Sequence, residues 1–272
     1  MRTSRTDRAW FASIVALSLA FGVFFLVPFA GMLERGLRHE GTWAVMTSST
    51  AQAALRLSLW TSTVTVILAV LFGTPVAYLL ARTSFRGKSI VDALVDLPIV
   101  LPPTVAGVAL LTAFGRKGLL GEPIDDWTGF TFGFRTLAVV MAQVLVSAPF
   151  FVRAAKSGFE SVDRQYERVA YTLGASKART FFRIVVPQAW PALFAGIVLC
   201  WARAMGELGA TLIFAGNLQG ETQTMPLAIL SAFEGSSLGL DGAIALSLVL
   251  LAVALAVLWV FRLASSRGFS RI

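Results

Sequence analysis

Few side chains in this 272-residue chain are suited to chemistry. It has one histidine, His39, and one cysteine, Cys200, so it cannot form an internal disulfide, a zinc site with several Cys and His ligands, or a Cys–His nucleophile pair. Cys200 falls in an apolar run, where a free cysteine is usually a small packing residue. We therefore expect no metal, no cofactor and no catalytic centre, and we expect that the chain is not an enzyme.

Three polar residues stand out because they follow or interrupt an apolar segment: Arg203, Glu207 and Thr211. Spaced by four, they share one face of a helix. Each charge would cost about 2.5–3.5 kcal/mol at the centre of a membrane, so the two charges should face each other, the interior of a bundle, or water. Two interpretations remain open. The residues form a packing ion pair, or they border a translocation path in which Arg203 offers positive potential to an oxyanion.

Apolar helices are expected to carry these three residues. The chain is 56% hydrophobic and 14% charged, whereas soluble domains carry about 25% charged residues. Six charge-free runs reach the roughly 17–25 residues that a membrane-spanning helix needs. They are Ala9–Leu33, Leu57–Ala81, Leu97–Gly115, Thr136–Val152, Ile184–Ala202 and Gly242–Phe261. We predict an all-α polytopic membrane protein with six transmembrane helices, the fifth continuing through Arg203 and Glu207 toward Phe214.

Prolines interrupt two of these runs. Pro75 lies inside the second, and Pro98, Pro102 and Pro103 lie at the head of the third. Such prolines kink a helix or delay its start, and the freed backbone groups must find other partners. Tight packing and a backbone that lines a cavity are both consistent with this pattern.

Lysine and arginine are distributed unevenly among the segments between the runs. Sixteen fall at the N-terminus, after the second and fourth runs, and at the C-terminus, and far fewer fall on the other side. Because basic residues mark cytoplasmic loops, we expect both termini in the cytoplasm. The net charge of +8 then reflects this bias, and no nucleic-acid partner is expected.

The longest basic segment, Tyr166–Pro191, has helical periodicity. Apolar residues recur at Val162, Tyr166, Val169, Ala170 and Leu173, the spacing of one helical face. Gly174 follows at a favoured helix C-terminus, Ser176 can cap a second helix, and Pro187 is expected at the turn into the fifth span. We predict a short helix, a glycine hinge and a second helix that leads into the membrane. The composition alone also fits an amphipathic helix lying on anionic lipid.

The spacing within this segment resembles the cytoplasmic loop of bacterial ABC importer permeases, whose pattern is E-A-A, three residues, G, nine residues, I-x-L-P. Gly174 occupies the glycine position and Ala170 that of the second alanine, and Ile184 and Pro187 follow at the expected distances. Val169 and Val186 replace an alanine and the leucine of the pattern.

One departure from the pattern concerns its glutamate. Arg168 stands at that position, and Glu167 just before it is expected to serve instead. In the family this loop is a coupling helix that docks in a groove of a separate ATPase subunit and transmits its closure to the membrane helices. The resemblance implies these coupling residues: Glu167, Arg168, Ala170, Leu173, Gly174, Ala175, Ile184 and Pro187.

Three further blocks are similar to the molybdate permease subunits of ABC importers. They are "LPIVLPPTVAGVALLTAFGRKGLLG" (Leu97–Gly121), "ARAMGELGATLIFAGN" (Ala202–Asn217) and "TQTMPLAI" (Thr222–Ile229). Sulfate permeases share the second block and, more loosely, the first. The resemblance implies import of molybdate, with tungstate or sulfate/thiosulfate as the alternative oxyanions.

The same resemblance implies an architecture and a set of partners. The fold would be the type I ABC importer transmembrane domain over residues 51–262, with the coupling loop at about 156–187. Residues 1–50 would add a first helix and a periplasmic loop, and residues 263–272 a short cytoplasmic tail. The chain has no G-x-x-x-x-G-K-[ST] motif, so ATP chemistry must come from another polypeptide. The implied partners are two ATPase copies, a second copy of this chain, a periplasmic or lipid-anchored oxyanion-binding protein and the lipid of a bacterial inner membrane.

Two other classes of membrane protein fit the sequence less well. An ion-coupled secondary transporter usually has a longer chain with inverted repeats and carboxylates at the midplane, whereas only Glu207 is a carboxylate well inside a predicted span. An integral membrane enzyme would need a cluster of His, Cys, Asp or Glu near the interface, and the sequence shows no such cluster.

Overall fold

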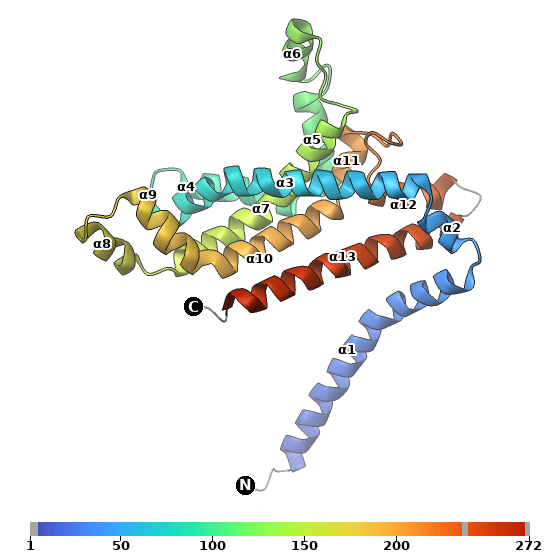
Figure 1. Cartoon of the computed structure of the whole chain (residues 1–272), viewed down its shortest axis with the longest axis horizontal. Coiled ribbons are helices and arrows are strands. Elements are labelled where there is room, and N and C mark those ends of the chain that lie inside the picture. The colour runs from blue at the N-terminus through green and yellow to red at the C-terminus, as the bar shows by residue number, and fades with distance from the viewer. Residues whose placement is uncertain (1–4, 236–238, 270–272) are drawn as a thin grey trace.

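Long helices dominate the computed structural model, which describes residues 5–235 and 239–269 (Figure 1). The helices are α1 (Arg5–Arg38), α2 (Thr42–Met46), α3 (Ser49–Arg82), α4 (Lys88–Val100), α5 (Pro103–Phe114), α6 (Gly121–Thr128), α7 (Thr136–Ser161), α8 (Arg164–Thr172), α9 (Lys177–Thr180), the π-helix η1 (Phe181–Val185), α10 (Val186–Met205), α11 (Gly209–Phe214), α12 (Met225–Gly235) and α13 (Gly239–Phe269).

Within the described ranges, five helical stretches are long and apolar enough to cross a membrane. They are α1, α3, α7, the continuous run of α9, η1 and α10, and α13. The bent pair α4–α5 provides a sixth when it is taken as one span. The predicted all-α membrane fold is therefore confirmed, and five of the six predicted runs lie within single continuous helical stretches.

The predicted third run, Leu97–Gly115, is broken at the prolines where a kink or a delayed start was expected. α4 ends at Val100 and α5 begins at Pro103, and their axes differ by 116°. Leu101 is extended, as residues before proline usually are, and neither Pro102 nor Pro103 has an N–H to continue the helical ladder. As a result α5 and α6 leave the bundle at a steep angle to α3 (Figure 1).

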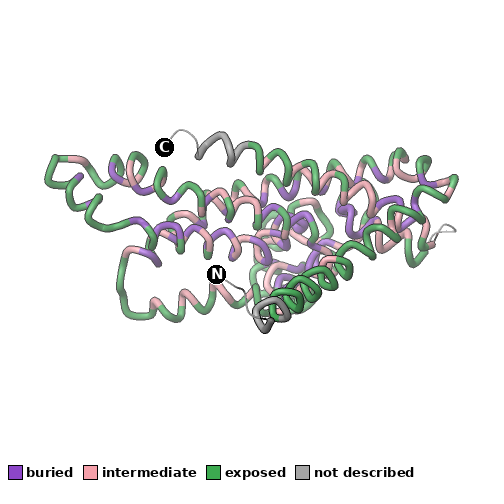
Figure 2. Tube along the Cα trace, turned by 90° about the horizontal axis from the view of Figure 1, so that it is seen from below, coloured by how far each residue is buried: buried purple, intermediate pink, exposed green. Residues whose placement is uncertain are grey.

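The centre of the bundle is α7, which packs along both α3 and α10. Small residues allow this close approach: an added Cβ at Gly158 would lie 2.6 Å from the Cβ of Ala192, and one at Gly196 would lie 2.9 Å from the Cβ of Ala154. Figure 2 shows buried positions concentrated where these helices run together, whereas α1 is exposed along nearly all of its described length.

The buried face of α3 continues with small polar residues in place of apolar ones. Ser58, Thr61, Ser62 and Thr65 are fully buried, and the Thr65 hydroxyl donates to Oε1 of Gln143 on α7 at 3.0 Å. Small hydroxyl side chains can bond within their own helix or across to the next one, so they permit close packing inside a membrane. The interior is thus held by both apolar and polar contacts.

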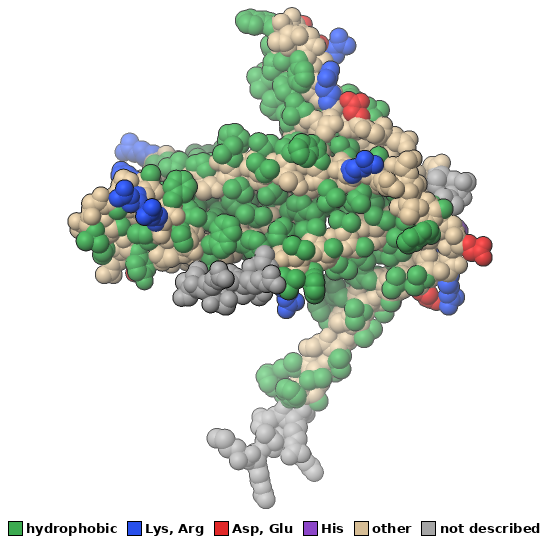
Figure 3. Space-filling view, viewed as in Figure 1, with side chains coloured by type: hydrophobic (Ala, Val, Ile, Leu, Met, Phe, Trp, Pro, Cys, Tyr) green, Lys and Arg blue, Asp and Glu red, His purple; other side chains and the backbone are tan. Residues whose placement is uncertain are grey.

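The two ends of the bundle differ in charge. Figure 3 shows a wide apolar surface over the long helices and a gathering of Lys and Arg side chains at the end formed by α8 and α9. We call this the basic end. Helices α2 and α12 lie at the opposite end of the bundle (Figure 1).

Candidate functional site

The predicted helix–hinge–helix segment is confirmed at the basic end. The Asp163 carboxylate accepts a hydrogen bond from the backbone N–H of Gln165 at 2.8 Å and begins α8. Gly174 has a φ of +80°, a left-handed conformation that glycine adopts without strain, and it ends the turn after α8. The Ser176 hydroxyl accepts from the N–H of Arg179 at 3.3 Å and caps α9.

The second helix enters the bundle without a turn. α9 continues through η1 into α10, so Lys177–Met205 forms one helical stretch of 29 residues. The prediction that Pro187 lies at a turn is therefore wrong. Pro187 is near the first position of α10, just after the π-helix, and such a bulge accommodates the missing N–H of a proline within a helix. A movement of α9 is thus carried directly into α10.

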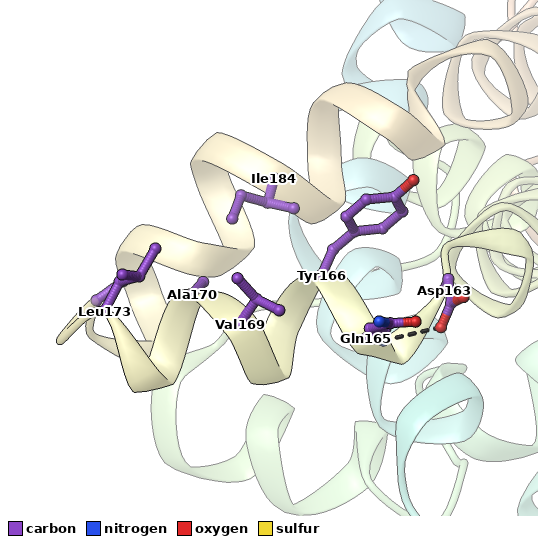
Figure 4. A pocket seen from close by; sticks show the side chains of 8 residues that line it. Asp163, Gln165, Tyr166, Val169, Ala170, Leu173 and Ile184 are labelled. Atoms are coloured by element: carbon purple, nitrogen blue, oxygen red, sulfur yellow. Dashed lines mark hydrogen bonds between the residues drawn. The ribbon is translucent and has the colours of Figure 1, made fainter.

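One side of α8 forms an open groove with the start of this long helix. Its volume is about 640 Å³, and Figure 4 shows Tyr166, Val169 and Ala170 on the side of α8 nearest to Ile184. Apolar side chains in it are unusually open to solvent; Leu173, for example, is 82% exposed. The groove is lined by Asp163, Gln165, Tyr166, Val169, Ala170, Leu173, Ala175 and Ile184.

Half of the predicted coupling residues therefore meet in this groove: Ala170, Leu173, Ala175 and Ile184. Gly174 forms the adjoining turn. Tyr166 and Val169 also belong to the groove, and the periodicity of α8 already placed them on the same face as Ala170 and Leu173.

Glu167 and Arg168 lie on another side of α8, which faces the end of α3. A small pocket of about 400 Å³ is lined there by Arg82, Arg164, Glu167, Arg168 and Tyr171. Arg168 is exposed, whereas Glu167 is buried and forms an ion pair with Arg82 at 2.9 Å. Partial burial and the nearby Glu167 carboxylate raise the pKa of Tyr171 above its usual value. Sequence reasoning missed Arg82, whose only signal was its position as the last residue of α3.

A second polar site lies where α10 ends. The predicted continuation of the fifth span to Phe214 is wrong, because α10 stops at Met205 and α11 begins at Gly209. Between them, Oε2 of Glu207 lies 2.7 Å from Nη1 of Arg203, and Oε1 accepts a hydrogen bond from the N–H of Ala210 at 2.8 Å. The Glu207 side chain is fully buried and that of Arg203 is 26% exposed.

Thr211 completes the predicted trio on α11. It is fully buried, and its hydroxyl has no hydrogen-bond partner within the described part of the chain. α11 packs tightly on α5: an added Cβ at Gly107 would lie 2.9 Å from the Cα of Ala210. The structure therefore brings Arg203 and Glu207 together at the helix break, whereas no contact joins the Thr211 hydroxyl to either of them. The break lies beside the α4–α5 bend, since an added Cβ at Gly209 would lie 3.1 Å from the Cβ of Pro103.

Among the described residues, no group of three or more His, Cys, Asp or Glu side chains could hold a metal ion. Cys200 is fully buried, as expected for a packing residue. What the molecule offers is an exposed apolar groove at its basic end and a buried ion pair at a helix break.

Comparison with known proteins relates this geometry to a transport family. Residues 69–267 match the family described as "Binding-protein-dependent transport system inner membrane component". The chain is 40% identical over 228 residues to the molybdenum transport system permease protein ModB of Escherichia coli (strain K12), covering 82% of this chain and 99% of that protein. It is also 40% identical over 209 residues to the molybdate/tungstate transport system permease protein WtpB of Pyrococcus abyssi, covering 77% of this chain and 76% of that protein.

A solved structure has the same fold. A chain in the crystal structure of a bacterial alginate ABC transporter, in complex with an alginate pentasaccharide-bound periplasmic protein, superimposes with a TM-score of 0.77. The match covers 97% of this chain and 96% of that chain, at 16% sequence identity. The fold is that of type I ABC importer transmembrane domains.

Proposed function

Because the chain belongs to the family of binding-protein-dependent transport system inner membrane components, we propose that it is the membrane-spanning permease subunit of an ATP-driven molybdate importer. The observation that carries the substrate class is the 40% identity to a molybdenum permease over almost all of that protein's length. The match to a molybdate/tungstate permease keeps tungstate as a second substrate.

The groove on α8 supports a docking role at the basic end. An amphipathic helix that exposes Leu173, Val169 and Tyr166 to solvent has an apolar face without an internal partner. We propose that this face docks on a separate ATPase subunit. ATP hydrolysis requires a chain with a phosphate-binding loop, and this chain lacks that motif. Gly174 and the continuous α9–α10 helix then carry a rigid-body movement into the membrane.

The remaining partners follow from the family. The loops at the end opposite the basic end would face an oxyanion-binding protein outside the membrane, and the apolar surface of the long helices would face lipid. We propose two copies of this chain and two of the ATPase, because six spans enclose no complete path by themselves. From the resemblance to the family, we also propose residues 51–262 as the transport domain and about 156–187 as its coupling loop.

Arg203, Glu207 and Thr211 are proposed to border the translocation path. They lie at the break between α10 and α11, and helix breaks at membrane depth occur where backbone is buried in protein or lines a cavity. Pairing with Glu207 weakens the field of Arg203, which suits a path that must release its ion.

Uptake measurements test the proposed function. The permease, reconstituted in liposomes with its ATPase and binding protein, should take up labelled molybdate only with ATP, and vanadate should stop uptake. Excess tungstate should compete and excess sulfate should compete less. Leu173→Asp places a charge in the α8 groove and should abolish ATPase binding, whereas Arg86→Gln at an exposed loop position should not. Uptake driven by an ion gradient without an ATPase would contradict the proposal.

A further inference from the structure

The buried ion pair between Arg82 and Glu167 joins α8 to the end of α3. The two side chains are 2.9 Å apart, and only 8% and 11% of their surfaces are exposed. Charges this buried are stable only when they are paired. Glu167 is thus committed to a contact inside the chain, on a different side of α8 from the exposed groove.

Tyr78 gives Glu167 a second contact on α3. The Tyr78 hydroxyl donates to Oε2 of Glu167 at 3.2 Å, so both carboxylate oxygens face α3. The ring of Tyr78 packs edge-on against Phe159 of α7, at 5.5 Å between centroids, and against Phe181 of η1, at 4.9 Å. The pair is therefore backed by an aromatic cluster from three helices.

Two backbone contacts complete the junction. Nη2 of Arg82 donates to the carbonyl of Val162 at 2.9 Å, in the connection before α8. In the reverse direction, Nη2 of Arg164 on α8 donates to the carbonyl of Ala81 at 3.3 Å. The last turn of α3 and the first turn of α8 are thus tied in both directions.

These contacts limit how α8 can move relative to the bundle. Gly174 connects α8 to α9 by a single glycine turn with open space around it, since an added Cβ there would meet nothing within 4 Å. The Arg82–Glu167 junction instead fixes α8 to α3 through several contacts at once. A force applied to the α8 groove therefore reaches α3 as well as α10.

We propose that the ion pair of Arg82 and Glu167 is an internal clamp between α8 and α3. Through this clamp, movement of the coupling helix is transmitted to α3 as well as to α10. In this proposal, which depends on the proposed function, Glu167 is a positioning residue and does not contact the ATPase. It fixes α8 to the bundle, while the groove residues bind the ATPase.

The test uses the complete importer in liposomes with four permease variants: Arg82→Gln, Glu167→Gln, the double variant with both changes, and Arg86→Gln. Arg86→Gln is the matched control, because it removes an exposed arginine from the adjacent loop. Three quantities are measured: ATPase that co-purifies with the permease, ATP hydrolysed, and molybdate transported per ATP.

Each single variant should keep the ATPase bound and lower molybdate transported per ATP by about tenfold, within the usual range for the coupling of two sites. The double variant should perform better than either single variant, because two amides leave no unpaired buried charge and can bond to each other. It also keeps the test decisive if a single variant fails to reach the membrane. Arg86→Gln should match the original protein.

Loss of ATPase binding in Glu167→Gln would overturn the proposal, since Glu167 would then be a docking contact. Single and double variants that transport as much per ATP as the original protein would overturn it as well. So would a double variant whose loss equals the product of the two single losses, because the two side chains would then act independently.

A substrate-free measurement separates this inference from the proposed function. Spin labels at Leu79→Cys on the exposed side of α3 and at Thr172→Cys on α8 report the distance between the helices in the complete importer. The clamp predicts a narrow distance distribution that broadens in Glu167→Gln and narrows again in the double variant. An unchanged distribution contradicts the clamp, whereas absence of ATP-driven molybdate uptake by the original protein contradicts only the proposed function.

Discussion

Glu207 uses its two carboxylate oxygens for two different purposes. One oxygen pairs with Arg203 on α10, and the other accepts from the N–H of Ala210 in the first turn of α11. The side chain thus connects the end of one helix to the start of the next. Because it is fully buried, its loss leaves both a guanidinium and an amide without their partner.

Glu207→Ala and Glu207→Gln should separate these two contacts. The alanine variant orphans the Ala210 amide, which we expect to cost about 1–3 kcal/mol. The glutamine variant keeps an acceptor for that amide and should be clearly more stable. Thermal unfolding of the purified permeases in detergent compares them, and equal midpoints would show that the cap contributes nothing.

Arg203→Ala tests whether the helix break borders the path. Because Arg203→Ala alone would leave the fully buried Glu207 carboxylate unpaired, it is combined with Glu207→Gln. The combined variant should lower molybdate uptake severalfold while the amount of permease in the membrane stays nearly constant. Arg56→Ala, an exposed arginine on α3, is the control. If only the amount in the membrane fell, the pair would be a packing contact and the path assignment would fail.

At the scale of elements, the coupling segment combines one soft joint with two rigid connections. The soft joint is the Gly174 turn between α8 and α9. The rigid connections are the continuous α9–α10 helix and the junction of α8 with α3. Because α8 is fixed to α3 and joined to α9 by the Gly174 turn, a displacement of α8 is passed to two helices that both pack on α7.

Gly174→Ala and Gly174→Asn probe the soft joint. An added Cβ meets nothing nearby, so the cost of either change comes from the backbone alone. Alanine in the left-handed region costs about 1–2 kcal/mol, and asparagine tolerates this region better. We expect the alanine variant to bind the ATPase more weakly than the asparagine variant in a titration of purified subunits. The reverse order would mean that the turn changes conformation on docking.

At the scale of the whole molecule, α1 and the arm formed by α5 and α6 project from the bundle, and the base of the arm packs on α7 and α11. In the spanning stretch of α1, Trp10–Arg38, only Gly36 is buried, and α1 approaches α13 only near its C-terminal end (Figure 1). The arm leaves the bundle because of the prolines between α4 and α5. A single chain with such extensions has wide apolar surfaces that lipid or a second copy can cover.

Native mass spectrometry of the importer, released from membranes in mild detergent, checks the proposed assembly. We expect two permease and two ATPase copies in the main species. Removing the α8 groove contact with Leu173→Asp should release the ATPase and leave the permease pair intact. A main species with one permease copy would contradict the proposed stoichiometry.

Features that depend on residues close together in the chain could be predicted from the sequence. Lengths of apolar runs specified the spanning helices, and the order Leu173, Gly174, Ser176 specified a hinge, because helix ends and left-handed turns are decided by the residues that form them. The prolines also indicated a kink in the third run, but its angle of 116°, the end of α10 at Met205 and the orientation of Glu167 depend on how the helices pack. Glu167 finds Arg82 85 positions earlier in the chain, and such a contact arises from how α3, α7 and α10 pack together, which no local pattern records.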